Sequence, residues 1–105
     1  MYYNSSYYSN LNAIRVYEDA RRIGDSIASE INLALKAGDG YSRVFYIPEK
    51  ILNSYDYNIS VKNYRIYLFW AAGSYQATIL TSGIVGELKK GENYLRNVGG
   101  IIYVN

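Results

Sequence analysis

Apolar residues between Asn10 and Ala37 recur with the period of an α-helix, and polar residues occupy the opposite side. On a wheel of about 100° per residue, one face collects Val16, Tyr17, Ala20, Ile23, Ile27, Ala28, Ile31, Ala34 and Leu35. Ser9 or Asn10 is a suitable N-cap, and Gly38 suits the left-handed residue that often ends a helix. The sequence therefore predicts one long amphipathic helix over residues 10–37.

The chain after Gly38 has the pattern of β-strands. The clearest alternation of apolar and polar residues covers 55–62, and both faces of 64–71 are largely apolar, as in a central strand. Turns are expected at Lys62-Asn63 and Gly73-Ser74. The predicted strands are 41–47, 55–62, 64–71, 75–80, 84–88 and 101–104, with 94–98 either a strand or a linking segment. We expect an α+β domain in which the helix packs on one antiparallel sheet of five to seven strands.

The length of 105 residues indicates a single domain. Residues 1–9 consist almost entirely of Tyr, Ser and Asn, and we expect them to be a disordered or linker lead-in. The domain is then residues 10–105. No run of about 18 apolar residues is present in the sequence, so it predicts no transmembrane helix within these residues.

The composition argues against an enzyme. The chain has no Cys and no His, which removes thiolate chemistry, the commonest general base and the commonest transition-metal ligand. We therefore expect no catalytic residues, no bound metal and no cofactor. A net charge of +2 with mixed signs does not favour nucleic acid or an anionic membrane surface.

Leu11 and Ile14 fall outside the apolar face of the predicted helix. One interpretation is that the first turns project beyond the globular part and that Leu11, Ile14 and Tyr17 pack against a neighbouring subunit. The other is that they are ordinary scattered apolar residues on the surface.

Gly24 is the second anomaly of the helix, because it lies on the apolar face. Glycine in a helix interior costs about 1 kcal/mol relative to alanine. We expect it to be tolerated because a strand passes close to it or because the helix bends there.

Several short motifs then occur in an order that is similar to one family. They are Ile31-Asn32-Leu33-Ala34, Gly38-Asp39-Gly40-Tyr41, Phe45-Tyr46-Ile47-Pro48, Tyr57-Asn58-Ile59, Gly86-Glu87-Leu88, Gly91-Glu92-Asn93 and Asn97-Val98-Gly99-Gly100-Ile101-Ile102-Tyr103-Val104. This order resembles the small archaeal secreted proteins with a class III (prepilin-type) signal peptide, which are pilin-like surface proteins. The resemblance covers roughly Ala20 to Asn105.

The resemblance implies a type IV pilin-like fold and a place on the surface or envelope of an archaeal cell. It implies a non-catalytic structural subunit that assembles with itself or with other pilin-like subunits, without nucleic acid or a small-molecule substrate. The family carries a basic stretch, a processing site and an apolar helix ahead of the amphipathic helix. This sequence shows none of them, so we expect them to precede Tyr2 in the natural protein, with the apolar helix contacting the membrane. Pro48 and the glycines of the motifs are expected at turns and strand ends.

Three other candidate sites are weighed against simpler interpretations. Asp39, Asp56 and Asn58 are possible calcium ligands if the fold brings them together. Arg43, Tyr46, Tyr64, Arg65 and Tyr67 form an alternating aromatic and basic set that suits single-stranded bases, although no basic cluster accompanies it. Asn4 and Asn58 each begin an N-glycosylation sequon.

The sequence thus predicts an extracellular structural subunit of an archaeal type IV pilus-like filament or surface appendage. The alternative is a monomeric, membrane-tethered extracellular binding or sensor domain with no filament role. These alternatives differ in what precedes residue 1 in the gene, and in whether neighbouring genes encode a prepilin peptidase and an assembly ATPase.

Overall fold

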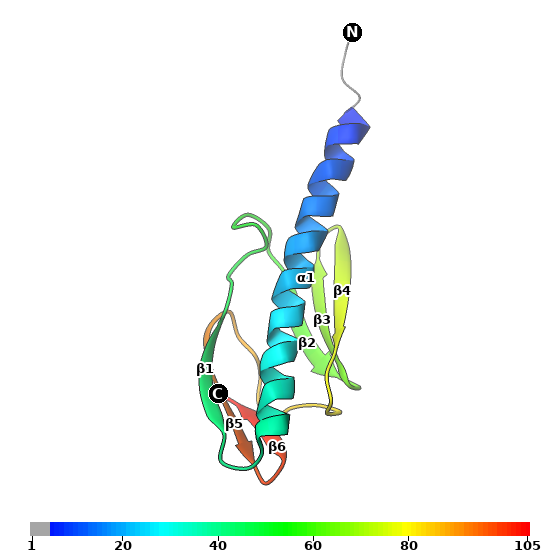
Figure 1. Ribbon diagram of the computed structural model, residues 1–105. Helices are drawn as coiled ribbons and strands as arrows, with labels where there is room; N and C mark the ends of the chain where they lie inside the picture. Colours follow the sequence, from blue (N-terminus) through cyan, green and yellow to red (C-terminus); the bar gives the residue numbers. More distant parts are fainter. Residues whose placement is uncertain (1–4) are drawn as a thin grey trace.

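The computed structural model describes residues 5–105 and the side chains from Asn10 onward. One long helix is followed by six strands, all on its C-terminal side in sequence (Figure 1). The elements in chain order are α1 (Ser5–Ala37), β1 (Ser42–Ile47), β2 (Asn58–Lys62), β3 (Arg65–Trp70), β4 (Gly73–Thr78), β5 (Gly91–Val98) and β6 (Ile101–Val104). The predicted α+β class with an N-terminal helix is therefore confirmed.

The helix begins earlier than its apolar pattern indicated. It starts at Ser5, so the expected cap at Ser9 or Asn10 is wrong, and residues 5–9 of the expected lead-in are helical. Residues 1–4 lie outside the described part of the chain. The C-terminal end is as predicted, because Gly38 follows Ala37 with a φ of 91° and donates its N–H to Ala34 O at 3.4 Å.

The strands form two antiparallel sheets of three strands rather than the single sheet that was expected. Their orders are β1-β5-β6 and β2-β3-β4, with β3 central in its sheet as predicted. Two-residue turns join β2 to β3 and β3 to β4, whereas β1 pairs with the distant β5. The predicted strand 84–88 is reduced to one parallel bridge between Val85 and Tyr103. Apolar alternation identifies strands but not their partners, which is why the division into two sheets was missed.

Two of the predicted turns are displaced. The β2–β3 turn is Asn63-Tyr64, with φ values of 52° and 65°, instead of Lys62-Asn63. Positive φ at both positions is the geometry that suits the right-handed twist of a two-residue hairpin. Gly73 and Ser74 already belong to β4, and the turn before them is Ala71-Ala72.

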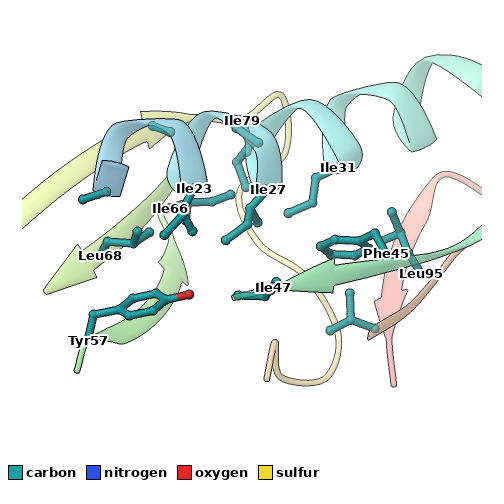
Figure 2. Close-up of a cluster of buried hydrophobic side chains, with 14 of the residues drawn as sticks. Ile23, Ile27, Ile31, Phe45, Ile47, Tyr57, Ile66, Leu68, Ile79 and Leu95 are labelled. Carbon is teal, nitrogen blue, oxygen red and sulfur yellow. The ribbon is translucent and has the colours of Figure 1, made fainter. Parts of the chain in front are cut away.

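The core follows the apolar face of α1. Ile23, Ile27 and Ile31 are 5%, 2% and 0% exposed. Figure 2 shows Ile23 and Ile27 beside Ile66 and Leu68 of β3, and it shows Ile31 directed toward Phe45 of β1. Both sheets therefore pack against the same face of α1.

Gly24 is explained by a close approach of β4. A Cβ atom at this position would lie 2.8 and 2.9 Å from Cδ2 and Cε2 of Tyr75, and 3.6 Å from Cδ1 of Leu68. The two distances to Tyr75 are shorter than real Cβ contacts, whereas the distance to Leu68 is an ordinary one, so glycine leaves room for the Tyr75 ring. The expectation that a strand passes close to Gly24 is confirmed.

The helix extends past the sheets at its N-terminal end. The described residues span 64 × 23 × 18 Å, and Figure 1 shows the first turns of α1 rising above β3 and β4. Every described side chain from Asn10 to Arg15 is exposed, and Val16 is the first buried one. Within the described residues, no helix has both the length and the apolar character needed to cross a membrane.

Candidate functional site

A groove opens where α1 leaves the sheets. It has a volume of about 880 Å³ and lies between the helix, the loop that precedes β2 and the β3–β4 hairpin. We call it the aromatic groove, and its lining residues are Asn12, Ala13, Val16, Tyr17, Ser54, Tyr55, Asp56, Tyr57, Asn58, Phe69, Trp70, Ala71, Ala72, Gly73 and Ser74. The side chains at the β3–β4 turn are small, and the space that they leave is bordered by the aromatic rings.

The helix wall of the groove is centred on Tyr17. Its ring meets Tyr75 edge-on, with centroids 5.7 Å apart and planes at 83°. It also lies 6.5 Å from the Trp70 ring at 57°. Tyr17 is still 42% exposed, so one side of it borders the groove while the other is held by β3 and β4 residues.

The loop wall is tied to the helix at two points. Asp19 Oδ2 accepts a hydrogen bond from the Leu52 N–H at 2.8 Å, and Asn12 Nδ2 donates to the Tyr55 hydroxyl at 2.8 Å. The loop turns tightly between Ile51 and Tyr55, whose backbone groups exchange two hydrogen bonds of 2.8 and 2.9 Å. These contacts hold an otherwise exposed loop in one position.

Tyr57 forms the floor beneath this loop. It is 2% exposed, and its hydroxyl donates to Pro48 O at 2.5 Å. The Lys90 ammonium lies 4.2 Å from the centroid of the same ring, a cation–π contact. Tyr57 therefore joins the groove to the segment that precedes β5.

The hairpin wall presents Phe69 and Trp70 on opposite faces of β3. Trp70 is half-buried toward Tyr17, and Phe69 is 45% exposed on the outer face of the sheet. Tyr67 is stacked on Phe69, with centroids 6.0 Å apart and planes at 6°. Aromatic surface therefore continues from the groove onto the outer face of the β2-β3-β4 sheet.

The charge of the groove is low. Among the described residues that line it there is no Lys or Arg, and Asp56 is the one carboxylate. Lys50 Nζ lies 3.2 Å from Asp56 Oδ1, but the Asp56 side chain is still 89% exposed. The site is therefore an aromatic surface with amide, hydroxyl and carboxylate groups at its edge.

Two phenols near the groove are held neutral. Burial raises the pKa of Tyr57, and the Glu49 and Asp19 carboxylates add to the effect. Burial, followed by the hydrogen bond that the Tyr75 hydroxyl donates to Asp25 Oδ1 at 2.5 Å, raises the pKa of Tyr75 to about 12. Neither phenol is poised to exchange protons near neutral pH.

The expected subunit-packing residues lie at the exposed end of α1. Leu11 is 42% exposed and Ile14 is 58% exposed, both on the part of the helix that the sheets do not cover. That these residues pack against another subunit stays a prediction. Tyr17 differs from them, because it also lines the aromatic groove.

The three possible calcium ligands are not brought together. Asp39 Oδ1 accepts a hydrogen bond from Gly99 N–H at 2.7 Å, next to the β5–β6 turn, whereas Asp56 and Asn58 lie in the groove. Among the described residues there is no group of three or more His, Cys, Asp or Glu side chains placed to hold a metal.

The proposed base-stacking set is divided between the two sheets. Arg43 and Tyr46 are on β1, and Arg43 Nε pairs with Glu30 Oε1 at 2.9 Å. Tyr64, Arg65 and Tyr67 are in the β2–β3 turn and β3 of the other sheet. The alternating platform that was considered as an alternative for these residues is therefore not formed, because a shared alternation does not place two strands in one sheet.

The two sequons have different outcomes. Asn4 lies outside the described residues. Asn58 is exposed at the start of β2 and lines the aromatic groove. Its modification stays a prediction.

Sequence reasoning missed the groove and two buried polar residues. Asn93 and Asn97 are 0% and 1% exposed on β5, whereas Asn93 was expected in a charged turn over 89–93 and Asn97 in a strand or linking segment. The only available signal was their spacing by four on the apolar face of an alternating strand. The groove had no local signal, since its walls come from three separate segments.

Comparison of the chain with protein-family models, curated proteins and solved structures found no match. The resemblance to archaeal pilin-like proteins therefore rests on the sequence motifs. Four glycines of these motifs lie at turns, as expected: Gly38 and Gly40 have φ near 90° between α1 and β1, and Gly99 and Gly100 have φ of 61° and 89° between β5 and β6.

Proposed function

We propose that the chain is an extracellular structural subunit of an archaeal type IV pilus-like filament or related surface appendage, with no catalytic role. The observation that supports this best is the uncovered beginning of α1. Leu11 and Ile14 are exposed there, on a helix of 33 residues that is about 50 Å long at 1.5 Å per residue. A long helix with apolar side chains beyond its own sheets suits packing against other helices.

Assembly in this proposal works through helix packing. The apolar helix that the resemblance implies ahead of Tyr2 anchors in the membrane or bundles with its neighbours, and Leu11, Ile14 and Tyr17 continue that contact. Fully burying a side chain of the size of Leu or Ile contributes about 1.5–3 kcal/mol. Repeated in every subunit, the burial of these side chains adds to the contact that the apolar helix makes. The sheets remain outside as the displayed part.

The test compares two charged substitutions on the same helix. Ile14→Glu places a charge in the proposed contact, and Leu33→Glu is the matched control, because Leu33 is 48% exposed on the part of α1 that carries the sheets. We expect Ile14→Glu to abolish filaments sheared from the native host and labelled with an antibody to this chain, and Leu33→Glu to leave them. Circular dichroism should show both variants folded.

Two outcomes contradict the filament proposal. One is the absence of labelled filaments in cells that express the wild-type chain. The other is a normal yield of labelled filaments from cells that express Ile14→Glu.

The second candidate function is a monomeric, membrane-tethered extracellular binding or sensor domain. The aromatic groove favours it, since binding sites are concave, rich in aromatic side chains and edged by a few polar groups. In that case Ile14→Glu leaves display on the cell surface unchanged, and the neighbouring genes encode neither a prepilin peptidase nor an assembly ATPase.

A further inference from the structure

We propose that the aromatic groove is a binding site for neutral oligosaccharides. The inference goes beyond the filament proposal and does not depend on it, and it gives a ligand class to the second candidate function. The groove combines exposed aromatic surface with hydrogen-bonding groups at its edge, and its lining residues in the described part of the chain include no cation.

The rings offer stacking surfaces for sugars. Tyr55 is 38% exposed and Phe69 is 45% exposed, and Trp70 is half-buried with its ring centroid 6.5 Å from that of Tyr17. One face of a pyranose ring carries polarised C–H groups, which are attracted to the negative face of an aromatic ring. The stacked Tyr67 and Phe69 rings extend this surface along β3, so the site suits a chain of several sugars.

The polar edge suits neighbouring hydroxyl groups. Asp56 has two acceptor oxygens on an 89% exposed side chain, and Asn58 is exposed with both a donor and an acceptor. Asn12 uses one N–H on the Tyr55 hydroxyl and keeps its carbonyl oxygen and its second N–H for a ligand. Neighbouring hydroxyl groups of a sugar each donate and accept hydrogen bonds, so they match this set of donors and acceptors.

Charge and polarity argue against other occupants. A nucleic acid or anionic lipid is bound mainly through Lys and Arg, and the described lining residues include neither, while the nearby Lys50 is paired with Asp56 at 3.2 Å. An apolar helix of another copy would bury Asp56, Asn58 and Asn12 without hydrogen-bond partners, which is unfavourable. The volume of about 880 Å³ lies in the usual range for small-ligand sites, about 300–1,000 Å³.

The experiment uses Trp70, which is the single Trp of the chain and lies in the groove. Its fluorescence is titrated with mannopentaose, cellopentaose and chitopentaose up to millimolar concentrations, using monomeric protein isolated by gel filtration. We expect a saturable change in emission with at least one of the three, and calorimetry should give the same affinity.

Variants test whether the proposed groups contact the sugar. Asp56→Asn keeps the shape of a highly exposed side chain, and Tyr55→Ala removes a stacking ring. Each should weaken binding by about tenfold, which corresponds to about 1.4 kcal/mol. Tyr46→Ala is the matched control, because Tyr46 is 65% exposed on β1 of the other sheet, and it should bind as the wild type does.

Three results overturn the saccharide proposal. These are no saturable response to any of the three sugars, equal affinity in the wild type, Asp56→Asn and Tyr55→Ala, or a Trp70 signal that changes with protein concentration alone, which places a second copy in the groove. Ile14→Glu should bind sugar normally, so failure of the filament proposal leaves this result intact.

Discussion

Gly24 sets the distance between α1 and β4. The Tyr75 ring occupies the place of the missing side chain and cannot simply swing away, because its hydroxyl is bonded to Asp25 and its ring meets the edge of Tyr17. The absence of one methyl group therefore allows an aromatic contact that also supports a wall of the groove.

Gly24→Ala is expected to destabilise the protein even though it improves helix propensity. The propensity gain is about 1 kcal/mol, whereas overpacking a filled site typically costs about 1–3 kcal/mol, and here it also displaces the Tyr75 hydroxyl. We expect a net loss of about 1 kcal/mol in the free energy of unfolding, measured in urea. Ser29→Ala, at an exposed position of the same helix, should not destabilise. A Gly24→Ala protein that is more stable than the wild type would contradict this prediction, because it would show that the Tyr75 ring moves aside at little cost.

Tyr75 also makes stability depend on pH in the alkaline range. Its pKa rises from 10.0 to about 12 on folding, so the folded state favours the neutral phenol. This contribution is complete below about pH 10, decreases as the pH rises toward about 12, and is lost above that. Tyr57 acts in the same direction.

Tyr75→Phe should therefore flatten the fall in the free energy of unfolding between pH 10 and 12 and should cost about 1 kcal/mol at pH 7. Urea denaturation at a series of pH values measures both effects. Tyr94→Phe, at an exposed position of β5, is the matched control. An identical pH profile for Tyr75→Phe and the wild type would exclude this role of Tyr75.

At the scale of elements, Asn97 fastens the C-terminal end of α1 to the β5–β6 hairpin. Its Nδ2 donates to Ala34 O at 3.0 Å, and its Oδ1 accepts from the Gly100 N–H at 2.8 Å. The Asn97 side chain is 1% exposed, and Ala34 O also accepts the Gly38 N–H at 3.4 Å, so the Asn97 amide adds a second, shorter hydrogen bond at this helix end. One amide thereby satisfies a helix end and a turn.

Asn97→Ala should lower the free energy of unfolding by about 1–3 kcal/mol, because two hydrogen bonds are lost and each contributes about 0.5–1.5 kcal/mol. Thermal denaturation measures the loss, and hydrogen exchange should be faster at the Gly100 amide. Glu92→Ala, at an exposed position of the same strand, should change stability by less than about 0.5 kcal/mol. A loss as small as that of Glu92→Ala would contradict the linking role.

At the scale of the whole molecule, the two parts of α1 have different surroundings. Its C-terminal part carries both sheets, and its N-terminal part extends beyond them (Figure 1). The aromatic groove lies at the boundary between these parts, where the helix, a loop and a hairpin meet. The filament proposal uses the uncovered turns and the saccharide proposal uses the boundary, so each is tested without the other.

Local features of this fold could be predicted from the sequence. The face of α1 that bears Ile23, Ile27 and Ile31 is buried as its period of 3.6 predicted, and β3 is central as its two apolar faces indicated. Gly24 was expected to mark either a close strand or a bend of the helix, and the structure has the close strand. These features depend on residues near each other in the chain, so the pattern of side chains is enough to determine them.

The tertiary structure alone decided which strands pair and where a site forms. The pairing of β1 with β5 joins Ser42 to Arg96 across a long stretch of chain, and alternation is the same whether six strands form one sheet or two. The groove unites Asn12, Asp56 and Trp70 from three segments. Burial of Asn97 depends on the carbonyl of Ala34 being in reach. Such contacts arise from the packing of distant elements, and no local pattern of residues encodes them.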